Sequence, residues 1–186
     1  MIKSSLELSE ALKKTVNSET EKITKVIDLI LFSIRNGNKI LVCGNGGSAA
    51  ESQHLVAELV VRFKRERKAI PAISLTTDSS ILTACSNDYS FANIFSRQIE
   101  ALANSGDILI CLTTSGKSEN LLNAAQMALK KNCSVISFTG INENPLENLS
   151  SICIKAQSEN TPRIQEIELF LIHEIADIIE TQLQSY

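Results

Sequence analysis

The sequence predicts an α/β fold, a three-layer sandwich in which a five-stranded parallel sheet is flanked by helices. Short apolar runs typical of strands alternate along the chain with longer segments of helical pattern. These runs are apolar throughout instead of at every second position, which is typical of parallel strands covered on both faces. The length of 186 residues suits one domain with a substantial core, so we expect a single domain over residues 1–186.

Each element is expected from a local pattern. Apolar residues recur every three or four positions over residues 3–36, which predicts a long first helix that Asn36-Gly37-Asn38 ends. A long last helix is expected from Thr161 to about Leu183, with Pro162 in its first turn. Strands are expected at 40–43, 70–75, 107–112, 133–138 and 152–155. Shorter helices are expected at about 48–65, 79–86, 90–103, 118–131 and 143–149. The first helix has more apolar residues than one sheet face needs, so we expect residues 1–36 to pack also against another subunit.

Composition and charge argue against several classes of partner. The net charge of −3 offers no basic surface to nucleic acid, so none is expected as a partner. No apolar run approaches the roughly 20 residues of a membrane helix, and the polar, acidic N-terminus does not resemble a signal peptide. The five cysteines have no CxxC spacing and most lie in or beside apolar runs, which favours buried thiols in a reducing compartment. We expect a cytoplasmic protein without a membrane partner.

The first candidate binding loop is Gly44-Asn45-Gly46-Gly47-Ser48, between an expected strand and an expected helix. Glycine permits positive φ and a close approach of the main chain to a ligand. The start of the next helix offers free N–H groups, which suit an anion or a ligand rich in hydroxyls. A dinucleotide site is an alternative because the loop fits G-x-G-x-x-A, but Asp78, the nearest acid after the second strand, lies beyond the usual spacing of about 20 residues. A purely structural turn is another alternative.

The second candidate binding loop, Thr113-Thr114-Ser115-Gly116-Lys117-Ser118, gives a sharper signal. Four hydroxyls, a glycine and exposed backbone N–H groups at a helix start suit a phosphate. The spacing G-x-x-x-x-G-K-[ST] of a Walker loop is missing. An ordinary helix cap needs one hydroxyl and would leave the others unexplained, so we predict phosphate binding. Both loops are expected beyond the carboxyl ends of the strands, where open parallel sheets bind ligands.

Four polar residues on two helices are candidates for catalysis or metal binding. His54 and Glu58 are four residues apart on one helix face, and Gln165 and His173 are eight apart on the last helix. The first two could form a surface ion pair, and a lone histidine on an apolar helix is more often a core residue. Spacing alone leaves a metal site as one interpretation among these.

At these residues the sequence resembles the SIS (sugar isomerase) domain family, and within it the phosphoheptose isomerases. The matching segments are Cys43-Gly44-Asn45-Gly46-Gly47-Ser48-Ala49-Ala50, Gln53-His54, Ala57-Glu58-Leu59, Arg62-Phe63, Ser86-Asn87-Asp88-Tyr89, Phe95-Ser96-Arg97-Gln98, Thr114-Ser115-Gly116-Lys117-Ser118 and Arg163-Ile164-Gln165-Glu166. The resemblance implies a flavodoxin-like sheet and a homotetramer with sites at subunit interfaces. It also implies isomerisation of sedoheptulose 7-phosphate to glycero-manno-heptose 7-phosphate, for the heptose of lipopolysaccharide or capsule.

The resemblance further implies roles for individual residues. Glu58 and His173 would be the catalytic proton-transfer pair. One Zn²⁺ per subunit would be bound by His54, Glu58, Gln165 and His173. The substrate would be bound by Asn45, Gly46, Gly47, Ser48, Glu58, Arg62, Asn87, Asp88, Thr113, Thr114, Ser115, Ser118 and Gln165.

Two positions depart from the family pattern. Thr113 replaces the usual serine and keeps the hydroxyl, while Glu168 replaces the usual histidine and could change the charge near Gln165 or the metal affinity. Gln165 and His173 would lie roughly 12 Å apart along one helix. Zinc–ligand bonds are about 2.1 Å, so we expect the Gln165 and the His173 of a given site to come from different subunits.

Two other functions are alternatives. One is a non-catalytic SIS module that resembles the replication-initiator-associating proteins, which would not need Glu58 and His173. The other is a sugar-phosphate-sensing regulatory domain, which no DNA-binding pattern in this sequence supports.

Overall fold

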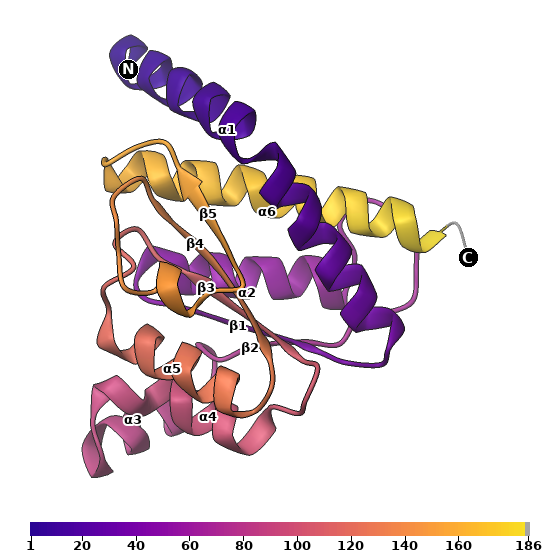
Figure 1. The fold of residues 1–186 in the computed structure, drawn as a ribbon, viewed down its shortest axis with the longest axis vertical. Coiled ribbons are helices and arrows are strands. Elements are labelled where there is room, and N and C mark those ends of the chain that lie inside the picture. Colours follow the sequence, from indigo (N-terminus) through magenta and orange to yellow (C-terminus); the bar gives the residue numbers. More distant parts are fainter. Residues whose placement is uncertain (185–186) are drawn as a thin grey trace.

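The structure, a computed structural model, describes residues 1–184 and confirms the predicted α/β sandwich (Figure 1). The five strands are β1 (Ile40–Gly44), β2 (Ala72–Ser74), β3 (Ile108–Leu112), β4 (Ser134–Gly140) and β5 (Ile152–Ala156). They form one sheet in the order β2-β1-β3-β4-β5, and every pair of neighbours is parallel. This is the flavodoxin-like order: β2 is added on one side of β1 and the later strands on the other side, so the topological switch point lies between β1 and β3.

Helices cover both faces of the sheet. They are α1 (Ile2–Arg35), α2 (Gly47–Val60), α3 (Ser79–Asp88), α4 (Ile94–Leu102), α5 (Glu119–Lys130) and α6 (Thr161–Gln184), with 3₁₀ turns η1 (Phe91–Asn93) and η2 (Glu147–Leu149). In Figure 1, α1, α2 and α6 lie on one side and α3, α4 and α5 on the other. The first half of α1 extends beyond the sheet, and its contact with another subunit remains a prediction.

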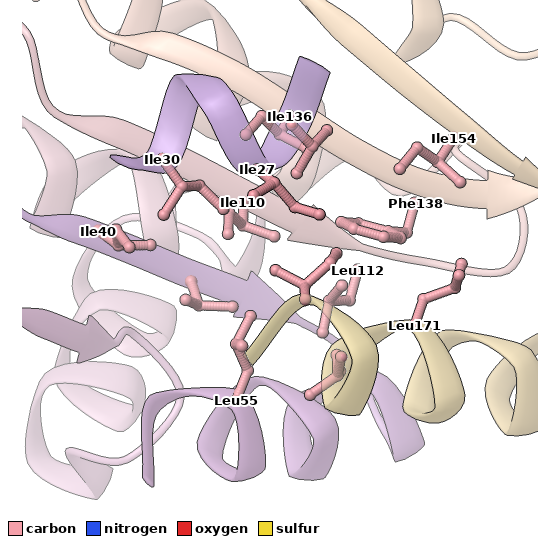
Figure 2. Packing of buried hydrophobic residues seen from close by; sticks show 14 of the residues in the cluster. Ile27, Ile30, Ile40, Leu55, Ile110, Leu112, Ile136, Phe138, Ile154 and Leu171 are labelled. Atoms are coloured by element: carbon pink, nitrogen blue, oxygen red, sulfur yellow. The ribbon is translucent and has the colours of Figure 1, made fainter. Parts of the chain in front are cut away.

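The hydrophobic core divides into two clusters because the strands are apolar on both faces. On the α1–α2–α6 side, Ile30, Leu55 and Leu171 from the three helices meet Ile110 and Phe138 from the sheet (Figure 2). The other cluster joins the opposite strand faces to α4 and α5. All five cysteines are buried and free, as expected. No helix among residues 1–184 is long and apolar enough to cross a membrane.

Three predicted elements are shorter than expected, each for a local reason. Helix α2 ends at Val60 and not near residue 65, because the next backbone N–H groups bind the Glu180 side chain. The helix expected at 143–149 is only the turn η2, since Pro145 interrupts it. The second strand starts at Ala72, after Pro71, which has no N–H for the sheet. In addition, η1 precedes α4 in the helix expected at 90–103.

A buried carboxylate joins the starts of β1 and β3, at the edge opposite the candidate loops. Asp107 is 1% exposed and accepts hydrogen bonds from the backbone N–H of Lys39 at 2.9 Å, the Lys39 ammonium and the backbone N–H of Asn104. Burial alone would raise the pKa of Asp107, but these donors lower it below its usual value. The carboxylate therefore stabilises the fold in its charged form.

We predict that Asp107→Asn lowers the free energy of unfolding by about 1–3 kcal/mol at neutral pH, because charge-assisted hydrogen bonds are lost. The folded-state pKa is lowered, so this stabilisation is present above the unfolded-state pKa of about 3.9 and disappears as the pH falls through the folded value. Denaturant unfolding of parent and variant, at neutral and acid pH, measures the difference. Asp28→Asn, at an exposed position of α1, is the control. A difference that stays constant from neutral to acid pH would contradict this account.

Candidate active site

The glycine loop after β1 has the backbone geometry that its composition predicts. Gly46 has φ +58°, and α2 begins directly after it. A Cβ on Gly44 would lie 2.5 Å from the Ser48 carbonyl oxygen, and one on Gly47 would lie 2.3 Å from Gln165 Nε2. Glycine is thus required at position 44, where the near atoms are backbone, whereas at position 47 a larger residue would displace the end of the Gln165 side chain. The Ala49 N–H donates to the Gly46 carbonyl at 3.1 Å, whereas within residues 1–184 the N–H groups of Gly47 and Ser48 make no hydrogen bond and remain available to a ligand.

The glycine loop is linked by a pair of side-chain amides to the start of α5, directly after residues 113–118, the predicted phosphate loop. Asn45 donates to Asn120 Oδ1 and Asn120 donates to Asn45 Oδ1, both at 2.9 Å. Asn120 is buried in the first turn of α5, two residues after Ser118. A hollow of about 590 Å³ is lined by Asn45, Ser90, Phe91, Ala92, Ser118, Glu119 and Asn120. Asn120 was not predicted as a site residue, because an asparagine in a helix gives no signal until its partner is known.

The phosphate loop is held by the chain while part of its hydroxyl set stays available. Gly116 has φ +62° and packs against Asn144, so this glycine is also required. The backbone N–H of Gly116 donates to the Thr113 hydroxyl at 3.3 Å. Within residues 1–184, the hydroxyls of Thr114 and Ser118 make no hydrogen bond, and that of Ser115 only accepts one from the Lys117 N–H. The loop can therefore offer several neutral donors to an anion.

The three residues His54, Glu58 and His173 converge in space. Their ligand atoms lie within 4.8 Å of one another. His54 Nε2 is 2.9 Å from His173 Nε2 and 3.2 Å from Glu58 Oε1. Two imidazole nitrogens that face each other beside a carboxylate can share a proton or bind one cation, and two imidazoles with a carboxylate are a donor set that zinc accepts.

The Gln165 side chain lies elsewhere in the same chain. It packs against Gly47, at the start of α2, whereas His54 lies seven residues further along that helix, about 10.5 Å at 1.5 Å per residue. Helices α2 and α6 therefore run alongside each other in the same direction, with Gln165 and His173 at different levels. Ser48 is buried and its hydroxyl faces Glu168, so its side chain does not point toward the hollow.

Two residues not in the predicted set support His173. The Phe63 ring stacks on the His173 ring, with centroids 5.2 Å apart and planes at 17°. Glu180, two turns after His173, accepts hydrogen bonds from the backbone N–H groups of Phe63, Lys64 and Arg65 at 2.7–2.9 Å. Burial would raise the pKa of Glu180, but these donors lower it. Only the fold shows that this acid fixes the loop after α2.

Three predicted substrate residues form no hydrogen bond or ion pair, within residues 1–184 of one chain, with the two candidate loops or with His54, Glu58 and His173. Asn87 and Asp88 are exposed in the last turn of α3, where the Asn87 amide donates to the Asp88 carboxylate at 2.8 Å. Arg62 is exposed after α2 and pairs with Glu66 at 3.7 Å. Their substrate contacts remain predictions.

Comparison with known proteins identifies the family of the chain. The sequence model of the SIS domain family matches residues 6–140. The phosphoheptose isomerase of Aliarcobacter butzleri is 44% identical over 183 residues, which are 98% of this chain and 97% of that protein. That of Helicobacter hepaticus is 48% identical over 163 residues, 88% of this chain and 83% of that protein.

Solved structures give the same result for the fold. The phosphoheptose isomerase structure from Neisseria gonorrhoeae superposes with a TM-score of 0.92 at 34% identity, over 97% of this chain and 96% of that one. The structure from Francisella tularensis gives a TM-score of 0.90 at 36% identity, over the same shares. The chain therefore belongs to the SIS domain family and, within it, to the phosphoheptose isomerases.

Proposed function

We propose that the protein isomerises D-sedoheptulose 7-phosphate to D-glycero-D-manno-heptose 7-phosphate, for the heptose of lipopolysaccharide or capsule, in the cytoplasm. The observation that supports it best is the convergence of Glu58 with His54 and His173, from two distant parts of the chain. The relatives named phosphoheptose isomerase match nearly the full chain, which gives the same reaction. A non-catalytic module would have no use for this convergence.

The substrate is held through neutral donors at its phosphate end. Hydroxyls of Thr113, Thr114, Ser115 and Ser118 and the N-terminus of α5 bind the phosphate. Asn45, Gly46, Gly47 and the N–H of Ser48 bind sugar hydroxyls, and the buried Asn120 orients the Asn45 amide. Asn87, Asp88 and Arg62 complete the set of substrate contacts.

The chemical step moves the carbonyl from C2 to C1 through an enediol. Glu58, as carboxylate, removes a proton from C1 and returns it to C2. His173 donates a proton to O2 as negative charge develops there, and accepts the proton of O1 when the C1 carbonyl forms. Phe63 stacks on the ring and Glu180 fixes the loop that places Phe63, so the His173 ring keeps one orientation.

One Zn²⁺ per subunit would fit the donor set of His54, Glu58 and His173. These residues would hold the ion where it could polarise the substrate oxygens and stabilise developing negative charge. Gln165 would supply a fourth ligand. Because the Gln165 amide of the same chain lies against Gly47, about 10 Å of helix from His54, that ligand comes from a partner subunit. The active protein is a homotetramer with its sites at subunit interfaces.

We predict that Glu58→Gln and His173→Ala each lower kcat by about 10²–10⁴-fold, the usual contribution of one acid or base. A coupled assay with sedoheptulose 7-phosphate, with the product identified by NMR, measures this. Glu159→Gln, at an exposed position before α6, is the control and keeps the parent rate. Turnover of the heptulose at the parent rate by either variant excludes the proposed proton transfer.

We predict that the purified protein binds about one equivalent of Zn²⁺ per chain and that His54→Ala lowers the affinity by at least about tenfold, because one of the protein ligands is lost. Titration calorimetry on chelator-treated protein measures the affinity, and thermal unfolding with and without the ion gives a second readout independent of turnover. Equal zinc affinity in the parent and in His54→Ala would exclude this site.

We predict that inactive Gln165→Ala and Glu58→Gln chains restore activity when they are refolded or expressed together. A mixed interface places an intact Gln165 from one chain beside an intact Glu58 from the other, in about a quarter of the sites for random mixing. Each variant alone is the control. If the mixture stays as inactive as its components, Gln165 acts within its own chain or not at all.

A further inference from the structure

A pair of carboxyl groups lies between α2 and α6, outside the set of residues assigned above. Glu168 is 1% exposed, and its carboxyl group is within hydrogen-bonding reach of that of Glu51. Among the described residues, Glu168 Oε1 and Glu51 Oε2 are buried with no donor to bind. Two ionised carboxylates in such a place would repel each other and remain unsatisfied, which is costly in free energy.

One proton would remove both the charge repulsion and the lack of a hydrogen-bond donor. If a single hydrogen lies between the two carboxyl groups, each orphaned oxygen gains a partner and the pair carries one negative charge instead of two. Burial, followed by the hydrogen bond and repulsion from Glu51, raises the pKa of Glu168 well above its usual value, and burial raises that of Glu51. Glu51 is the titratable group that faces Glu168; Ser48 and the Thr113 N–H are neutral.

Glu168 also touches both binding loops. The Ser48 hydroxyl, in the first turn of α2, donates to Glu168 Oε2 at 3.4 Å. The Thr113 backbone N–H donates to the Phe138 carbonyl at 3.1 Å, and it also lies close enough to the Glu168 carboxylate to lower its pKa. Helix α6 thus connects the glycine loop and the first residue of the phosphate loop through one side chain.

We propose that Glu51 and Glu168 share one proton at neutral pH, and that Glu168 is a positioning residue whose place between the Ser48 hydroxyl and the Thr113 N–H sets the spacing of the glycine and phosphate loops. When the proton is lost, Glu51 and Glu168 both carry a negative charge and repel each other. The repulsion moves α6 away from α2 and weakens binding of the sugar phosphate. The positioning role rests on the proposed function, whereas the shared proton does not.

The variant Glu168→Gln tests whether the two carboxyl groups share a proton. The amide has the shape of a protonated carboxyl group: it can donate to Glu51 and accept from Ser48 and Thr113. A raised folded-state pKa stabilises the parent below the unfolded value of about 4.3, and that contribution disappears as the pH rises through the folded value. The parent should therefore lose stability toward alkaline pH relative to Glu168→Gln, with Glu166→Gln, exposed on the same helix, as control.

Infrared difference spectroscopy of the complete protein detects a protonated carboxyl group directly. We expect a protonated-carboxyl band at neutral pH in the parent and in Glu166→Gln, and its absence from both Glu168→Gln and Glu51→Gln. If one of these two glutamine variants does not fold, the other still shows whether the band belongs to this pair. The inference is overturned if the band is missing from the parent, or if parent and glutamine variants show the same dependence of stability on pH.

The positioning role has its own readout in KM for sedoheptulose 7-phosphate. In the parent, KM should rise by up to about tenfold for each pH unit above the point at which the pair loses its proton, while kcat changes less. In Glu168→Gln this rise should be absent, and in Glu168→Ala KM should be raised at all pH values. A parent with the band but no turnover refutes the proposed function and leaves the shared proton standing; an active parent whose KM follows the same pH profile as Glu168→Gln refutes the positioning role.

Discussion

The alignment of α6 along α2 is the constraint on which the rest of the site depends. The two helices run in the same direction, and contacts occur at successive levels: Gly47 with Gln165, Ser48 with Glu168, and His54 with His173. Below these, the loop after α2 binds Glu180. Because helices side by side keep their register along their whole length, a shift at one level would displace all the others.

Apolar packing fixes that register, and the polar contacts depend on it. Leu55 and Leu59 of α2 lie in the same core cluster as Leu171 and Ile175 of α6, together with the sheet residues that both helices cover. Buried polar groups such as Glu168 and Glu180 contribute little net stability compared with apolar side chains of equal volume. Their value lies in specifying one arrangement, since a displaced carboxylate would lose its donors and stay buried.

The two loops differ chemically from the cluster of His54, Glu58 and His173 on α2 and α6. The donors that they offer are neutral hydroxyls and backbone N–H groups, so a phosphate could be held without a basic side chain. This agrees with the slightly acidic net charge of the chain. The Asn45–Asn120 amide pair joins the glycine loop to the first turn of α5, directly after residues 113–118, and the Glu168 side chain lies between Ser48 and the Thr113 N–H. Positions of donors, and not attraction over a distance, determine what these loops can recognise.

The α/β class, the parallel sheet, the long terminal helices and both loops could be predicted from the amino-acid sequence, because apolar runs and glycine–hydroxyl clusters are local signals. It also identified His54, Glu58 and His173 as candidates, through helical spacing and family resemblance. It did not predict where α2 ends, because the backbone there is bound by Glu180, more than a hundred residues later. Only the tertiary structure brought His173 to His54, paired Asn120 with Asn45, and placed Glu168 against Glu51. Each of these contacts joins segments about 75 or more residues apart, and no local pattern of residues encodes which side chains will meet across such a separation.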